Sequence, residues 1–322
     1  MLQRYILFWL IASSGVAGVW PKFGLEFDPF VASAPWLNSL IIVTMFCVGA
    51  LLPVHEVNQV LQKWPTVLAG TTIQYVSMPL LAWTVVSVLK PAPEVAAGIL
   101  IVGCVPGAMA SNVLTLAAKG NVSYSVSLTT SATLLSPLVV PITLWLTMDN
   151  RIEYDGWAAV QLMLVRVVAP VVIGHLLSRY VGRFRSLAMN YGSAVANLTI
   201  LAIIAVVVAL KRNEITQASS DLLLALLLLN VCGFLAGYFG GAAFRFNEGK
   251  RRALTLEVGM QNAGAGIVLA TKLFGPESAA VIPCALYTFG CMLTGTILAT
   301  FWQWHGDDDA NDFPDQESTV TD

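Results

Sequence analysis

The sequence is dominated by apolar segments about as long as a membrane-spanning helix. The hydrocarbon core of a bilayer is about 30 Å thick, so one crossing needs roughly 20 residues of helix, whose backbone groups are paired internally. We predict about ten such spans, and they lie near Ile6–Trp20, Leu37–Leu52, Thr66–Leu89, Ala96–Ala118, Val122–Leu146, Trp157–Leu177, Ala194–Leu210, Leu222–Phe244, Ala253–Leu273 and Ala280–Trp302. With 57% hydrophobic residues, 11% charged residues and a mean hydropathy of +0.73, no soluble class fits. We expect an all-α integral membrane protein surrounded by lipid, with no nucleic-acid partner.

The positive residues between the spans predict the orientation of the chain, because short loops rich in Lys and Arg stay in the cytoplasm. One side has the larger set, which comprises Arg4, Lys63, Lys119, Arg179, Arg183, Arg185, Arg245, Lys250, Arg251 and Arg252. The other side has only Lys22, Lys90, Arg151, Lys211, Arg212 and Lys272. We therefore predict a multi-pass protein of the plasma membrane, a bacterial inner membrane, with both termini cytoplasmic.

The composition changes after Trp304. Residues 1–305 form the predicted membrane domain, whereas residues 306–322 are polar and contain seven of the nineteen acidic residues. A segment of high net charge and low hydropathy does not bury enough apolar surface to fold. We predict that 306–322 is a disordered cytoplasmic tail.

An acidic residue, Glu257, stands inside the apolar stretch Ala253–Leu273. A carboxylate in the hydrocarbon region is costly unless a positive partner meets it, so it indicates a functional site. Gly259, Gly264 and Gly266 follow it and weaken a continuous helix. A broken helix inside a membrane exposes carbonyl groups that an ion can satisfy. The pattern predicts a cation site.

The first half of the chain has its own interruption, Gly103-Cys104-Val105-Pro106-Gly107, about half the chain before Gly259. Matching breaks suggest two five-helix repeats, about 1–150 and 151–305. A repeat with an odd number of spans inserts its second copy upside down, so the broken fourth and ninth spans would cross near the midplane. Isolated Pro-Gly kinks are the alternative explanation.

Small polar residues gather around the first break. Ser111 and Asn112 follow it, and Ser125 and Thr129 lie four residues apart on one face of the fifth span. Hydroxyls, amide oxygens and carbonyls carry little charge and suit a hard monovalent cation. Sodium fits this set, although such residues also serve as ordinary helix contacts.

Several separated motifs together resemble the bile acid:sodium symporter family, in the right order from about Leu37 to Trp302. The motifs are Gly103-Cys104-Val105-Pro106-Gly107, Ala110-Ser111-Asn112-Val113, Gly120-Asn121-Val122, Leu135-Ser136-Pro137 and Glu257-Val258-Gly259-Met260-Gln261-Asn262. The resemblance implies a sodium-coupled symporter of an organic anion that works by alternating access, not an enzyme, with a panel domain (spans 1, 2, 6 and 7) and a core domain (spans 3 to 5 and 8 to 10).

The resemblance also implies two sodium ions in the core and no other cofactor. The first sodium site would use Ser111, Asn112, Ser125, Thr129 and Glu257. The second would use Gln74, Glu257, Gln261 and the carbonyls of Val258 and Met260. The substrate cleft beside the crossing would include Met109, Asn262 and Cys291.

The resemblance leaves the substrate open among small carboxylates, namely a bile acid, a pantothenate-like molecule or a keto acid. Met109 and Cys291-Met292 stand where polar cavity residues occur in bacterial bile acid transporters, which argues against bile acids. An arsenite- or proton-coupled exporter of the same superfamily is the alternative. A membrane channel or receptor is a further alternative. A channel would show pore-lining rings and a receptor would show a soluble output region, and the sequence shows neither feature.

Overall fold

The computed structural model describes residues 6–25, 27–52, 64–148, 155–216 and 219–305. Over these residues the chain is helical, with one isolated antiparallel β-bridge between Gly107 and Gln261. The predicted tail, 306–322, lies outside the described residues.

Seven helical stretches in the described ranges are long and apolar enough to cross a membrane. They contain α3 (Leu37–Leu51), α5 (Trp64–Leu89), α8 (Val122–Thr147), α9 (Gly156–Met163) with the π-helix η4 (Leu164–Val168) and α10 (Ala169–Tyr180), α12 (Ser193–Leu210), α14 (Ser220–Ala243) and α17 (Val281–His305). Each stretch overlaps one predicted span. Two stretches begin with short elements: η3 (Ala34–Trp36) precedes α3, and α11 (Gly182–Leu187) with η5 (Ala188–Gly192) precedes α12. Outside the stretches, η2 (Trp20–Phe23) and α2 (Pro29–Ala32) precede the first one, and α13 (Arg212–Thr216) lies between α12 and α14.

The other three predicted spans coincide with shorter helices. The first is α1 (Ile6–Val19), and the fourth and ninth are each divided into two: α6 (Pro93–Cys104) with α7 (Ala110–Ala117), and α15 (Glu248–Gly259) with α16 (Ala263–Phe274). Pro106 in the first break lacks an N–H and cannot continue a helix. In the second break Met260 is extended, and the Asn262 side chain caps α16 by accepting a hydrogen bond from Ala265 N at 3.1 Å. The prediction of a break in each half is confirmed.

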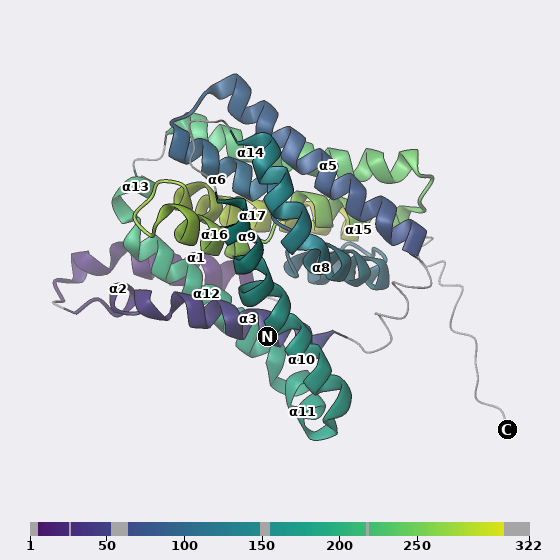
Figure 1. The fold of residues 1–322 in the computed structure, drawn as a ribbon, viewed down its shortest axis with the longest axis horizontal. Helices are drawn as coiled ribbons and strands as arrows, with labels where there is room; N and C mark the ends of the chain where they lie inside the picture. Colours follow the sequence, from purple (N-terminus) through teal and green to yellow (C-terminus); the bar gives the residue numbers. More distant parts are fainter. Residues whose placement is uncertain (1–5, 26, 53–63, 149–154, 217–218, 306–322) are drawn as a thin grey trace.

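The helices pack in two groups (Figure 1). In the small bundle, α3 packs against α10 and α12, and α12 packs against α1. In the large bundle, α14 packs against α5 and α15, and α8 also packs against α5 and α15. There α17 packs against α6, α7, α14 and α16. Figure 1 shows α16 and α17 between α5 and α14 on one side and α3 and α12 on the other.

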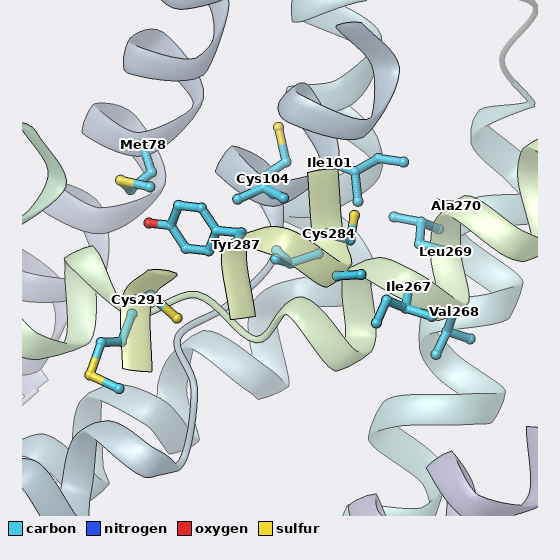
Figure 2. Packing of buried hydrophobic residues seen from close by; sticks show 14 of the residues in the cluster. Met78, Ile101, Cys104, Ile267, Val268, Leu269, Ala270, Cys284, Tyr287 and Cys291 are labelled. Atoms are coloured by element: carbon cyan, nitrogen blue, oxygen red, sulfur yellow. The ribbon is translucent and has the colours of Figure 1, made fainter. Parts of the chain in front are cut away.

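Close helix crossings depend on residues without side chains. A Cβ atom on Gly49 of α3 would collide with the Val171 carbonyl of α10, and one on Gly174 would collide with the Phe46 carbonyl. Small residues allow such contacts in membranes, where burial of apolar surface supplies little driving force between helices. In the large bundle the contacts are dense and apolar, and Figure 2 shows Met78, Cys104 and Tyr287 among the buried side chains.

A buried lysine joins the two bundles at one end. Lys211, at the end of α12, is 1% exposed, and its Nζ donates to the Glu277 carbonyl oxygen at 2.7 Å in the connection between α16 and α17. Next to it, Arg212 pairs with Asp28 at 2.5 Å and donates to the Ala17 carbonyl. The sequence placed Lys211 in a loop, but tertiary packing covers it.

Candidate functional site

The two helix breaks meet each other. Ala108 N donates to Met260 O at 2.7 Å, and Asn262 N donates to Pro106 O at 2.7 Å. These bonds form the antiparallel bridge, so backbone groups that the breaks release from helices are paired across the crossing. The crossing therefore fixes the relative positions of the ends of α6, α7, α15 and α16.

Glu257, in the last turn of α15, is fully buried beside the crossing. Its Oε2 accepts hydrogen bonds from Ser111 Oγ at 2.5 Å and Thr129 Oγ1 at 2.7 Å. Gly107 leaves the space for this carboxylate, because a Cβ atom at that position would fall on Glu257 Oε1. One oxygen of the acid is thus held by α7 and α8, and the glycine of the other break makes room for the second.

The hydroxyl groups that bond to Glu257 Oε2 belong to a larger hydrogen-bonded cluster of hydroxyl and amide groups. Ser125 Oγ donates to Asn112 Oδ1 at 2.8 Å, and Thr129 Oγ1 lies 3.4 Å from the same oxygen. Thr115 Oγ1 donates in turn to Ser125 Oγ at 3.2 Å. The polar residues that the sequence places on α7 and α8 converge on Glu257.

Several buried oxygens of the helices at the crossing lack hydrogen-bond partners in the described structure. Among the described residues, the buried atoms without a hydrogen-bond partner include Glu257 Oε1, Gln261 Oε1 and both polar atoms of the Gln74 amide. Gln74 belongs to α5, which packs against α15. Buried polar atoms normally have partners, and unpaired ones indicate a missing ligand or strain. Three of these four atoms are oxygens, which favours a cation as the partner.

The carbonyl groups at the end of α15 are partly used. Gln261 Nε2 donates to Val258 O at 2.6 Å, and Met260 O accepts from Ala108 N. Gly259 O accepts two bonds of 2.8 Å, from Asn230 Nδ2 and from Tyr287 OH. Each carbonyl oxygen has two lone pairs, so Val258 O and Met260 O retain one each.

A cavity of about 350 Å³ lies beside the crossing, and both bundles contribute to its wall. Met109, Asn262 and Cys291 are among its lining residues, with Thr44, Met45 and Asn197 from the small bundle. The described residues that line it include no Lys, Arg, Asp or Glu side chain. A cavity of this size and mostly apolar lining is typical of a site for a small organic molecule.

The sequence analysis did not identify the residues that hydrogen-bond to the site residues and hold them in place. Asn230 and Tyr287 hold the Gly259 carbonyl, and Thr115 supports Ser125. Asn230 carried a detectable signal, because it is an amide within the apolar stretch of α14. Gln74 and Gln261, assigned to one site by resemblance, both have orphaned oxygens, but neither side chain bonds to Glu257 in the described structure.

A family model and several known proteins match this chain. Residues 39–218 match the family model described as Sodium Bile acid symporter family. The chain is 31% identical over 290 residues to the uncharacterized sodium-dependent transporter YocS of Bacillus subtilis (strain 168), across 88% of this chain and 90% of the relative.

Two further relatives come from eukaryotes. The probable chloroplastic sodium/metabolite cotransporter BASS1 of Arabidopsis thaliana is 31% identical over 83% of this chain and 67% of its own length. The hepatic sodium/bile acid cotransporter of Rattus norvegicus is 27% identical over 74% of this chain and 67% of its own length. All three relatives carry names of transporters.

Proposed function

Because the chain belongs to the Sodium Bile acid symporter family, a family of sodium-dependent multi-pass transporters, we propose that it takes up a small organic anion together with two sodium ions. The observation that carries this proposal is the convergence of buried oxygen ligands on Glu257 where the two broken helices cross. One carboxylate among neutral oxygens suits monovalent cations, which need several ligands and little total charge.

The proposed sodium sites lie on the two sides of Glu257. The first comprises Ser111, Asn112, Ser125, Thr129 and Glu257, whose side chains already contact one another. The second comprises Gln74, Glu257, Gln261 and the carbonyls of Val258 and Met260, and it is supported by the orphaned oxygens of the three side chains. Sodium would replace hydrogen bonds in the first site and supply missing partners in the second.

The proposed transport cycle moves the two bundles against each other. We assign the small bundle as the panel domain, and the large bundle as the core domain that carries both sodium sites. The element lengths support inverted repeats, because α5 and α8 have 26 residues each and α14 and α17 have 24 and 25, with a broken helix between the members of each pair. We retain ten spans, cytoplasmic termini and a bacterial inner membrane as parts of this proposal.

The cavity favours an organic anion as the transported substrate. Its volume, about 350 Å³, is more than an inorganic oxyanion such as arsenite needs, and its apolar wall suits a carbon skeleton. No basic side chain among its described lining residues can neutralise the anion, so the sodium ions would do so. This reasoning favours a monocarboxylate over arsenite as the transported substrate.

Purified protein in proteoliposomes tests the coupling. We expect an inward sodium gradient, with equal potassium as the control, to drive accumulation of a carboxylate found by a thermal-shift screen in sodium. A true substrate should stabilise the protein more in sodium than in potassium, because both ligands bind the same folded state. The proposal would be overturned if the substrate stabilised the protein equally in the two salts and if uptake did not depend on the sodium gradient.

A further inference from the structure

Several polar side chains that line the cavity already donate hydrogen bonds to other groups of the protein. Thr130 and Thr288 donate to carbonyl oxygens one turn back in their own helices, at 2.7 Å and 3.0 Å. Thr44 bonds to Leu40 O at 2.8 Å and to Thr199 at 2.7 Å, across the contact between α3 and α12. These hydroxyl groups therefore have no O–H donor left for a ligand.

Asn197 is different. Its Nδ2 is buried and has no hydrogen-bond partner among the described residues, although the residue belongs to the cavity wall. It shares one face of α12 with Ser193 and Ile200, which also line the cavity and are four and three residues away. A buried amide N–H group without a partner destabilises the protein, so the presence of Asn197 in the apolar α12 requires an explanation.

The opposite wall has a comparable group. Asn262 uses its Oδ1 to cap α16, and within the described structure nothing accepts a hydrogen bond from its Nδ2. The cavity wall therefore carries amides with unused hydrogen-bonding capacity on both bundles, among them Asn262 beside the crossing and Asn197 on α12. A ligand that bonds to both amides must span the boundary between the bundles.

We propose that Asn197 is a specificity-determining residue that hydrogen-bonds a second, uncharged polar group of the transported anion. This inference rests on the proposed function. The substrate class is then a monocarboxylate whose skeleton carries a hydroxyl, keto or amide oxygen away from the carboxylate. The charged end lies toward the crossing and the sodium ions, and the uncharged group reaches α12. Plain aliphatic carboxylates fit the cavity but leave the Asn197 amide unpaired.

Paired probes separate this inference from simple hydrophobic binding. The probes are the aliphatic monocarboxylates from pentanoate to octanoate, each paired with its terminal hydroxyl analogue, and binding is measured by thermal shift in sodium and in potassium. We expect wild type to bind at least one hydroxylated probe more tightly than its aliphatic parent. Asn197→Leu should abolish this preference, because it weakens binding of the hydroxylated probe about tenfold, the effect of one lost hydrogen bond, and leaves binding of the parent unchanged.

Ser14→Ala is the matched control. Ser14 also has a buried hydroxyl without a partner in the small bundle, but it is not part of the cavity wall. This variant should keep the preference for hydroxylated probes. The shift produced by sodium alone should be the same in wild type and Asn197→Leu, which shows that the fold and the sodium sites remain intact.

Two results would overturn the inference: a wild type that does not prefer any hydroxylated probe to its parent, or an Asn197→Leu variant that keeps the preference. Failure of the proposed function has another signature, since no carboxylate would then stabilise the protein more in sodium than in potassium. The two failures are therefore distinguishable in the same experiment.

Discussion

The two carboxylate oxygens of Glu257 have different surroundings. Oε2 accepts bonds from Ser111 and Thr129, whereas Oε1 is buried without a partner in the described structure. A buried carboxylate without full compensation is destabilising, so a cation that binds Oε1 should stabilise the fold. In the proposed mechanism, this acid would contact both sodium ions.

Replacement of Glu257 by Gln tests the charge alone, because the amide keeps the shape and one oxygen. We expect Glu257→Gln to remain folded in potassium and to lose both the stabilisation by sodium and the coupled uptake. The measurements are thermal unfolding in sodium and potassium, and uptake by proteoliposomes. Asp221→Asn is the control, since that acid is exposed in the first turn of α14 and belongs to neither break. Sodium-driven transport by Glu257→Gln at the wild-type rate would contradict the mechanism.

The two sodium sites should be separable by single substitutions. Thr129→Ala removes a ligand of the first proposed site and Gln261→Ala a ligand of the second, and each should weaken sodium binding by about 1–3 kcal/mol. Sodium titrations of uptake, with their Hill coefficients, provide the measurement. Thr143→Ala is the control, because its hydroxyl bonds to Val139 O within α8 and the residue does not line the cavity. An unchanged affinity and Hill coefficient in either site variant would remove that residue from its site.

At the scale of elements, the important feature is the contact between the two breaks. Pro106 and Gly107 lie in one break, Met260 and Gln261 lie in the other, and two backbone bonds of 2.7 Å join the breaks. Unpaired backbone inside a membrane is costly, so each break is stable only against the other. The crossing is a property of the pair of helices and not of either sequence motif alone.

Gly107→Ala should damage the crossing, because the added methyl would collide with the Glu257 carboxylate. We expect a large loss of sodium affinity together with reduced thermal stability. Gly290→Ala in α17 is the matched control, since a Cβ atom there meets nothing within 4 Å and alanine favours a helix by up to about 1 kcal/mol. The explanation fails if Gly107→Ala binds sodium as tightly as Gly290→Ala does.

At the scale of the whole molecule, the cavity lies between two bundles that are held together at one end by Lys211 and Glu277. A fully buried ammonium group must keep its hydrogen bonds, and this contact therefore resists separation of the bundles there. In the proposed cycle such contacts form and break as the cavity opens to either side.

Charge balance predicts that transport depends on voltage. Two sodium ions, one carboxylate and a monovalent organic anion make a neutral loaded site, whereas the empty site carries the charge of Glu257. Each cycle should then move one net positive charge inward, and a membrane potential negative inside should favour uptake by roughly 2.3 kcal/mol per 100 mV. Uptake under potassium diffusion potentials set with valinomycin measures this. Uptake of a monovalent anion that ignores the potential would exclude the stoichiometry of two sodium ions per anion.

The amino-acid sequence alone determined the class of the protein, the helical stretches and the two breaks. These features follow from local hydropathy, proline and glycine, and Glu257 was identifiable because an acid is rare in an apolar span. The roles of Asn230, Tyr287 and Asn197 were not predictable in this way, since a polar residue in a helix gives no indication of which distant group it faces. Only the tertiary structure brought residues 107 and 261 together, buried Lys211 and left the Asn197 amide unpaired at the cavity wall. Such contacts depend on how helices far apart in the chain pack, and local sequence patterns do not encode that packing.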